Sequence, residues 1–314
     1  MLPALVLTAG LATRLRPLSF VRAKAALPVA GEPLVRHILR WLHAHGVGEA
    51  VLNLHHLPHT VTGCVGDGRD IGVRVRYSWE VPVLGSAGGP RRALPLLDAP
   101  EFLIVNGDTL TDLDLAPVVA SHRASDALVT MAVVPNTEPQ KYSGLAVDAD
   151  GRVTGVVPRG SAQPSHHFFG VQVVNADAFA AVPEGVPYET VSQLYPQLMA
   201  ARPGAVRAFH AHAAYHDIGT PSDYLDTSLR ISRQSGVEGV GARTVVAPDA
   251  RVERSILWDD VVVEAGAMLK ECVVADGARV PAGTSWHGVT LRPATGELAA
   301  GERRIGELAI CTLP

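Results

Sequence analysis

The sequence has few cysteines, few lysines and no long hydrophobic run. Its three cysteines, Cys64, Cys272 and Cys311, are an odd number without CxxC spacing, which argues against a disulfide framework or a thiolate zinc site. No apolar stretch approaches the ~20 residues that a membrane helix needs, and the first ten residues lack a basic leader and a cleavage-type site. We therefore expect a soluble, cytoplasmic protein that does not contact a membrane.

A positive net charge is also lacking. The formal net charge is -4, and no basic stretch is interleaved with aromatic residues, which argues against bulk attraction to nucleic acid. Any phosphate binding must therefore rest on individual residues. Of the 27 arginines and lysines only Lys24, Lys141 and Lys270 are lysines, so each lysine raises the question of whether its compact ammonium is needed there.

Apolar runs and helical periodicities alternate over the first part of the chain. With 314 residues, of which 47% are hydrophobic, the chain can form one large domain and a smaller one. Expected strands cover residues 2–7, 50–54, 73–78, 102–105, 127–134, 144–147, 153–157 and 170–174. Expected helices cover residues 34–45, 86–97, 115–124, 190–201 and 221–234, the last with Thr220 as its N-cap. This alternation predicts an α/β domain over residues 1–235, with a Rossmann-like, doubly wound, mostly parallel sheet.

The pattern changes after residue 235 to a six-residue repeat of small and apolar side chains. The repeat runs from Val240 through Val246 and Val252, slips by one residue near Trp258, and continues through Leu257 and its successors at 263, 269 and 275. Such repeats predict a short left-handed parallel β-helix of two to three coils in a domain of residues 236–314. An ordinary β-rich tail is the alternative, and the strand-like stretch 306–313 has no predicted place.

A glycine turn follows the first apolar run and is the strongest candidate for a functional site. The turn at Gly10 exposes backbone N–H groups, and Thr13 and Arg14 follow within the next four residues. Main-chain donors and a guanidinium fork suit a polyphosphate, and Lys24 adds a point charge. The turn matches neither GxGxxG nor GxxxxGK[ST], so these two common phosphate-binding motifs do not explain it.

This stretch resembles the pattern AxGxGTRLxPLTxxxPKP of the sugar-1-phosphate nucleotidyltransferases. That family includes mannose-1-phosphate guanylyltransferase, to which the pattern is most similar, as well as thymidylyl- and uridylyltransferases. Ala12 stands where the family usually has glycine, and Ala23 where it usually has proline. Three further segments resemble the family's GTAG, NGD and DIGTP motifs in the required order, namely Gly85–Gly88, Asn106–Asp108 and Asp217–Pro221. Taken alone, Asp108 fits a turn and Asp217 fits a helix cap.

The resemblance implies a role for each matched residue. Arg14 and Lys24 would be catalytic, and Asp108 and Asp217 would bind Mg²⁺ as the cofactor. The implied nucleotide-binding residues are Leu7, Ala9, Gly10, Leu11, Ala12, Thr13, Glu80, Gly85, Ser86, Ala87 and Gly88. The implied sugar-phosphate-binding residues are Asn106, Gly144, Arg159, Phe169 and Gly170. The implied substrates are an NTP and a sugar-1-phosphate, and we expect a homo-oligomer, a dimer or tetramer, formed through the C-terminal repeats.

The segments that select the substrate match the family less well. Pro158 stands where the family has a sugar-binding glutamate, although Arg159 can replace the lysine that follows it. Phe168 and Phe169 make their side of the pocket bulkier. Glu80 could accept hydrogen bonds from guanine, which favours GTP and hence mannose-1-phosphate. A uridylyl- or thymidylyltransferase, a non-catalytic regulatory relative and an acyltransferase using the repeats are the alternatives.

Overall fold

The computed structural model describes residues 1–237 and 239–314 of the chain. Contacts within the chain define two compact units: unit 1 comprises Met1–Gly10 and Arg36–His216, and unit 2 comprises Leu11–Val35 and Asp217–Pro314. The predicted division into a domain of residues 1–235 and a repeat domain of residues 236–314 stays a prediction.

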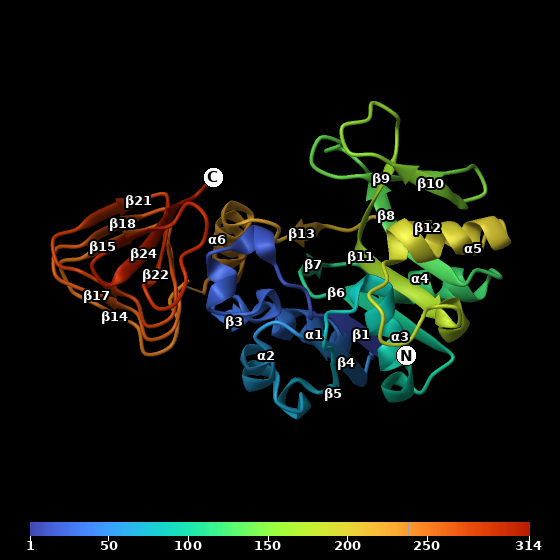
Figure 1. Ribbon diagram of the computed structural model, residues 1–314, viewed down its shortest axis with the longest axis horizontal. Coiled ribbons are helices and arrows are strands. Elements are labelled where there is room, and N and C mark those ends of the chain that lie inside the picture. The colour runs from blue at the N-terminus through green and yellow to red at the C-terminus, as the bar shows by residue number, and fades with distance from the viewer. Residues whose placement is uncertain (238) are drawn as a thin grey trace. The chain divides into compact units, whose positions relative to one another are not determined.

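Unit 1 contains a nine-stranded sheet with the order β10-β9-β11-β6-β1-β4-β5; β8 also pairs with β11, and β12 pairs with β8 (Figure 1). Strands β5, β4, β1 and β6 run parallel, whereas β11 pairs antiparallel with β6 and β8. The predicted α/β fold with a mostly parallel sheet is confirmed. The strands of this sheet are β1 Ala4–Leu7, β4 Glu49–Leu54, β5 Arg74–Trp79, β6 Glu101–Asn106, β8 Val129–Pro135, β9 Gly144–Val147, β10 Val153–Val157, β11 His166–Asn175 and β12 Val206–His210. Strands β7 Thr109–Thr111 and β13 Tyr215–Asp217 form a separate two-stranded sheet.

Helices pack on this sheet and cover its core. Helix α3 contacts β1, β4 and β5, α4 contacts β8 and β11, and α5 contacts β10 and β12. The buried core includes Leu5 and Ile104 of the sheet and Ala93 of α3. The helices are α1 Leu34–Ala44, α2 Pro58–Val65, α3 Gly85–Leu97, α4 Leu115–Arg123 and α5 Tyr195–Ala201, the last preceded by a π-helical turn at Thr190–Leu194. None of the helices described is both long and apolar enough to cross a membrane.

Unit 2 contains three columns of parallel strands that form a β-helix (Figure 1). Each strand pairs with one 17 residues further on, as Val245 does with Val262 and Val262 with Arg279. A coil is thus one residue shorter than three hexapeptides, which explains the slip near Trp258. The strands are β14 Val245–Val246, β15 Arg251–Glu253, β16 Ile256–Leu257, β17 Val262–Val263, β18 Met268–Lys270, β19 Val273–Val274, β20 Arg279–Val280, β21 Ser285–His287 and β22 Val289–Pro293. The left-handed sense of the coil stays a prediction.

The last two strands pack on the end of this β-helix. Strand β24 (Leu308–Thr312) pairs antiparallel with β22, and β23 (Arg303–Ile305) pairs with β24. Beneath them the guanidinium of Arg292 lies 2.6 Å from the carboxylate of Glu302, and both side chains are buried. The stretch 306–313, which had no predicted place, therefore completes one side of the β-helix.

The segment 11–35 packs within unit 2 beside α6 (Pro221–Ser235) and the first coils. It contains short helical turns and the hairpin of β2 (Pro28–Val29) and β3 (Glu32–Pro33). Tyr224 of α6 donates its hydroxyl proton to the carbonyl of Pro28 and accepts a hydrogen bond from Trp258 at 2.9 Å. As predicted, Thr220 caps α6, because its hydroxyl accepts from the N–H of Asp223 at 3.1 Å.

Arg22 joins this N-terminal segment to the β-helix. Its guanidinium donates to Asp259 and Asp276, each at 2.6 Å, and lies over the ring of Trp258. Burial opposes the charge of Arg22, but the hydrogen bonds and charges of the two aspartates outweigh burial, so its pKa is raised.

Replacing Arg22 by alanine should destabilise unit 2, since both aspartates lose a charged donor in a partly buried place. We expect a loss of about 1.5–3 kcal/mol in the free energy of unfolding, measured by urea titration. Arg279→Ala is the matched control, because Arg279 also lies 2.6 Å from a carboxylate, that of Glu264, but its side chain is 58% exposed. A loss for Arg279→Ala should stay below about 1 kcal/mol, and equal losses for the two variants would refute this account.

Candidate active site

The carboxyl end of β6 carries Asn106, Gly107 and Asp108, and it lies beside the carboxyl end of β1. Asn106 pairs with Leu7, and the N–H of Gly107 donates to the carbonyl of Leu7 at 3.0 Å. A Cβ atom at position 107 would lie 2.5 Å from that carbonyl oxygen, so this approach requires glycine. The half-buried Asp108 thus follows the strand end at an edge where parallel sheets commonly bind ligands.

Gly107→Ala should therefore destabilise the protein, because the added methyl group meets backbone rather than a movable side chain. We expect a loss of about 1–3 kcal/mol in the free energy of unfolding, measured by urea titration. Gly63→Ala is the control: its Cβ would meet no atom within 4 Å, and its place in α2 favours alanine. The account fails if Gly107→Ala is as stable as Gly63→Ala.

A buried polar network connects the ends of β1 and β4 to the start of α3. Asn53 accepts from the N–H of Thr8 at 2.6 Å and donates to Glu80 at 2.7 Å, and the other carboxylate oxygen of Glu80 accepts from the N–H of Leu84 at 2.7 Å. Glu80 is 1% exposed. Burial raises the pKa of its carboxyl, although these two donors act against the rise. A contact between Glu80 and guanine, as predicted, would have to use the acceptor positions that Asn53 and Leu84 leave on this buried carboxylate.

The segment Gly85–Gly88 begins α3 and is covered by residues 186–190 of the same unit. The carbonyl of Tyr188 accepts from the N–H groups of Ala87 and Gly88, and the carboxylate of Glu189 accepts from the N–H and the hydroxyl of Ser86. A Cβ atom at Gly88 would lie 2.7 Å from the carbonyl oxygen of Val186. The small residues of this segment therefore allow the backbone of residues 186–188 to pack closely against it. A contact between this segment and a nucleotide stays a prediction.

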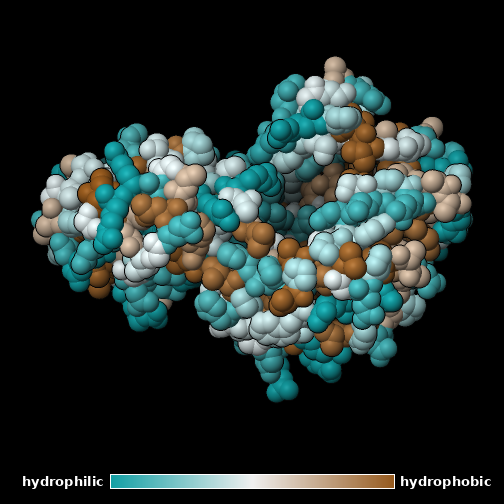
Figure 2. Space-filling model, viewed as in Figure 1, coloured by the Kyte–Doolittle hydropathy of each residue, from teal (hydrophilic) through white to brown (hydrophobic). Residues whose placement is uncertain are grey.

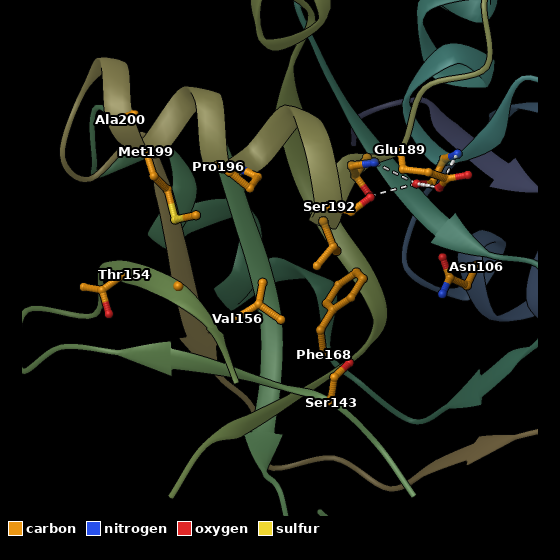
Figure 3. Close-up of a pocket in the computed structure, with 14 residues that line it drawn as sticks. Asn106, Ser143, Thr154, Val156, Phe168, Glu189, Ser192, Pro196, Met199 and Ala200 are labelled. Atoms are coloured by element: carbon orange, nitrogen blue, oxygen red, sulfur yellow. Dashed lines mark hydrogen bonds between the residues drawn. The ribbon is translucent and has the colours of Figure 1, made fainter. Parts of the chain in front are cut away.

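A cavity of about 1060 Å³ opens beside this covered segment, between β10, β11 and α5. Figure 3 shows Glu189 and Asn106 on one side of it and Val156 and Met199 on the other. Figure 2 shows the surface of unit 1 hollowed next to the lobe that carries β9 and β10. The lining residues are Ser86, Asn106, Ser143, Thr154, Gly155, Val156, Phe168, Glu189, Thr190, Val191, Ser192, Pro196, Met199 and Ala200. The volume suits a small polar ligand with room for a substituent.

A smaller cavity of about 390 Å³ shares Ser143, Val156, Phe168 and Val191 with the first one. Its other lining residues are Lys141, Tyr142, Gly144, Leu145, Arg159 and His167. The predicted residues Gly144 and Arg159 thus lie in the wall of one cavity, together with a second cation. Burial, aided by the charge of Lys141, lowers the pKa of His167 to about 4, so this histidine adds no positive charge at neutral pH.

The two neighbouring phenylalanines of β11 face different surroundings. Phe168 lines both cavities, whereas Phe169 is 3% exposed and stacks on Tyr215 with ring centroids 5.5 Å apart. Alternate residues of a strand point to opposite faces, which explains the difference. The structure therefore places Phe168, rather than the predicted Phe169, in the cavity wall.

Gly170 and Gly144 are positions where the backbone comes close to other groups. Gly170 has a φ of 97°, and a Cβ there would lie 2.8 Å from the side chains of Asn106 and Thr109. A Cβ at Gly144 would collide with the side chain of Ser165. Both glycines are thus needed by the fold itself, and their contacts with a sugar phosphate stay predictions.

Three of the predicted residues gather within unit 2, at the start of α6. The Lys24 ammonium lies 4.0 Å from the carboxylate of Asp217. A Cβ placed on Gly219 would lie 3.5 Å from the Arg14 guanidinium and 3.7 Å from the other oxygen of Asp217. The same Cβ would lie 3.1 Å from the carboxylate of Asp223. Residues 14 and 24 are far from residue 217 in sequence, so the fold brings two cations to one carboxylate, with a second carboxylate nearby.

The turn itself is divided between the units. Leu7, Ala9 and Gly10 belong to unit 1, whereas Leu11, Ala12, Thr13 and Arg14 belong to unit 2. Ala12 has a φ of 47° and a ψ of 43°, the left-handed conformation that glycine adopts freely and that costs another residue about 1–2 kcal/mol. The family pattern has glycine at this position. Ala12 therefore adopts the same turn, but in a conformation that is strained for a residue with a side chain.

Several histidines pack against aromatic rings or against one another. Within residues 1–237 and 239–314, no group of three or more histidine, cysteine, aspartate or glutamate side chains is placed to hold a metal ion. Instead, the His167 ring packs between Tyr142 and Tyr215, and the ring of His166 packs edge-on against His210. These contacts give His166 and His167 packing roles.

Comparison with known proteins identifies the class to which this fold and site belong. The sequence pattern of the family described as Nucleotidyl transferase matches residues 3–234, and the chain belongs to this family. It is 27% identical over 292 residues to mannose-1-phosphate guanylyltransferase of Mycobacterium tuberculosis, covering 89% of this chain and 81% of the relative. It is 33% identical over 198 residues to N-acetylmuramate alpha-1-phosphate uridylyltransferase of Neisseria meningitidis, covering 62% of this chain and 83% of the relative.

A solved structure supports the fold. HddC from Yersinia pseudotuberculosis aligns with a TM-score of 0.65 and 23% identity, covering 74% of this chain and all of that chain. At this level of identity the likeness is one of fold.

No sequence motif predicted the roles of two residues in this part of unit 1, Asn53 and Glu189. Asn53 connects Thr8 to Glu80, and Glu189 holds Ser86 from 103 residues away. A signal for Asn53 exists, because it is a polar residue inside the apolar strand Glu49–Leu54 and is 3% exposed. Glu189 follows a proline-rich loop and carries no comparable signal.

Proposed function

We propose that the protein transfers a nucleotidyl group from an NTP to a sugar-1-phosphate, giving an NDP-sugar and pyrophosphate. The observation that carries this proposal is the placement of Lys24 beside Asp217, with Arg14 close to Gly219, in a chain of the nucleotidyl transferase family. Both relatives compared above are named for a nucleotidyl transfer to a sugar phosphate.

In this reaction an oxygen of the sugar phosphate attacks the α-phosphorus of the nucleotide in line. A P–O bond forms there, the bond from the α-phosphorus to the bridging oxygen breaks, and pyrophosphate leaves with the electron pair. No protein nucleophile is needed, so the protein positions the groups and neutralises charge. Arg14 would bind the β- and γ-phosphates of the leaving group, and Lys24 would stabilise the charge that develops at the α-phosphate.

We propose Mg²⁺ as the cofactor, with Asp108 and Asp217 as its carboxylate ligands, as the resemblance to the family implies. Both offer the hard oxygen ligands that Mg²⁺ prefers, and the ion commonly takes one or two carboxylates and completes its shell with water and substrate phosphates. Asp217 is accessible, with 22% of its side chain exposed. When bound, the ion would supply positive charge to the phosphate oxygens. The Lys24 ammonium, 4.0 Å from the carboxylate of Asp217, would help to orient that carboxylate.

We propose GTP and mannose-1-phosphate as the preferred substrates. The support for this pair is the sequence pattern and the similarity to mannose-1-phosphate guanylyltransferase over 89% of the chain. The similarity to a uridylyltransferase makes UTP with another sugar-1-phosphate the alternative. The hydrogen bonds of Glu80 to Asn53 and Leu84 leave the guanine contact of Glu80 as the weakest part of this choice.

The test is pyrophosphate release from the full chain with Mg²⁺, using GTP, UTP, dTTP, ATP and CTP against a panel of sugar-1-phosphates. The proposal predicts sustained release that requires both substrates and is fastest with GTP and mannose-1-phosphate. A faster rate with another pair of substrates would replace GTP and mannose-1-phosphate as the proposed substrates but would leave the proposed reaction unchanged. A non-catalytic regulatory relative would bind an NDP-sugar yet release no pyrophosphate with any pair.

A further inference from the structure

Glu189 is held at the edge of the large cavity by the start of α3. Its Oε2 accepts from the hydroxyl of Ser86 at 2.5 Å and from the Ser86 N–H at 3.2 Å. The same hydroxyl accepts from the N–H of Thr190 at 2.8 Å, so the segment is fixed on both sides of Glu189. Gly85 allows this arrangement, because a Cβ there would lie 2.5 Å from Oε1 of Glu189. The carboxylate is therefore fixed in position although the residue is exposed.

The charge of Glu189 distinguishes one end of the cavity. Among the described residues that line the cavity, Glu189 is the one with an ionisable side chain, and the others offer hydroxyl, amide or apolar groups. A carboxylate has about four acceptor positions, of which Ser86 fills two. The remaining positions suit hydrogen-bond donors, and neighbouring hydroxyl groups of a sugar ring are such donors.

The adjoining small cavity has the opposite charge. Lys141 and Arg159 line it, and four shared residues connect it to the large cavity. A ligand that spans the two would present an anion to the cations and neutral donors to Glu189, since a second anion near Glu189 would be repelled. A sugar phosphate has this distribution of groups. Val156 and Phe168, which line both cavities, offer apolar surface for the faces of the ring between them.

We propose that Glu189 binds ring hydroxyl groups of the sugar-1-phosphate and thereby selects the sugar. The inference rests on the proposed function and names a specificity-determining residue for it. The phosphate lies toward Lys141 and Arg159, the hydroxylated edge lies toward Glu189, and Ser86 orients the carboxylate.

The test replaces Glu189 by glutamine in the full chain. Glutamine keeps the shape and an acceptor for Ser86 but removes the charge that strengthens hydrogen bonds from hydroxyl groups. We expect the KM for the sugar-1-phosphate to rise about tenfold or more, while the KM for the nucleotide stays within about twofold. Glu184→Gln is the matched control, because Glu184 is exposed in the same loop and does not line the cavity. Its kinetic constants should equal those of the unmodified protein.

Sugar-1-phosphates that each lack one ring hydroxyl separate binding from a merely structural role. For the unmodified protein, the analogue without the hydroxyl that Glu189 binds should lose about tenfold or more in kcat/KM. In Glu189→Gln, loss of the same sugar hydroxyl should lower kcat/KM much less, because the hydrogen bond between that hydroxyl and residue 189 has already been weakened. Ser86→Ala should give a smaller rise in the KM for the sugar, since the carboxylate is present but less well oriented.

The outcomes also separate this inference from the proposed function. If the unmodified protein releases no pyrophosphate with any substrate pair, the proposed function fails. If it is active and Glu189→Gln leaves the sugar KM unchanged, or if every deoxy analogue loses equally in both proteins, Glu189 does not bind the sugar. A fall in thermal stability with unchanged sugar KM would assign Glu189 to holding α3 alone.

Discussion

Replacing Lys24 by alanine is expected to lower turnover by about 10²–10³, with a much smaller effect on nucleotide binding. The physical reason is that negative charge grows on the α-phosphate and the approaching sugar phosphate as the new bond forms. An ammonium placed there stabilises the transition state more than the bound substrates. Lys24 is 16% exposed and lies 4.0 Å from Asp217, so its position is defined by the fold of unit 2.

The measurement is the initial rate of pyrophosphate release at saturating substrates, together with the Kd of the nucleotide. Lys270→Ala is the matched control, because Lys270 is exposed in β18 and its loss should leave turnover unchanged. Lys24→Arg tests the geometry: a planar fork in place of a compact charge should recover only part of the rate. Near-normal turnover of Lys24→Ala would remove Lys24 from the chemistry.

Replacing Asp217 by asparagine should be about as severe, with a loss of about 10² or more in turnover. Asparagine has the same shape but no charge, so the loss should arise from weaker Mg²⁺ binding and from the changed surroundings of Lys24 and Arg14. The Mg²⁺ concentration that gives half-maximal activity should rise. Asp108→Asn should show the same rise, because we propose Asp108 as the second ligand.

Asp226→Asn is the control for the aspartate variants, since Asp226 is exposed on α6 and nine residues beyond Asp217. The activity of each variant is measured as a function of Mg²⁺ concentration, and thermal unfolding is followed in parallel. If Asp217→Asn loses activity with an unchanged Mg²⁺ requirement, Asp217 acts on Lys24 and Arg14 and not on the ion.

Apolar runs in the sequence predicted the central strands, and the N-cap residue Thr220 predicted the start of α6. The run Leu2–Leu7 and the strand at 102–105 became β1 and β6 because both are buried on two faces of the sheet. Helix α2 was missed, since its sequence PHTVTGCV is rich in β-branched residues and has a glycine, and neither favours a helix. The six-residue repeat predicted the β-helix, but its period of 17 emerges only when paired strands are seen.

The motifs pointed to individual residues, whereas the contacts between those residues came only from the structure. Arg14, Lys24 and Asp217 were predicted separately, and unit 2 places them together. The partners of Glu80 could not be predicted, because a buried carboxylate and a ligand-binding carboxylate look alike in sequence. Glu189 was missed for a related reason: its contact with Ser86 joins residues 103 apart that share no pattern. Long-range hydrogen bonds depend on the packing of the chain, not on local periodicity.

The most direct measurement of the central claim follows the phosphorus atoms of the nucleotide. The full chain is incubated with Mg²⁺, a sugar-1-phosphate and the best nucleotide of the panel, labelled in one reaction at the α-phosphorus and in another at the γ-phosphorus. Nucleotidyl transfer predicts the α-label in the NDP-sugar and the γ-label in pyrophosphate, with both products strongly reduced for Lys24→Ala. A γ-label found in free phosphate or on the sugar, or an α-label that stays in the NTP and never appears in an NDP-sugar, would contradict it.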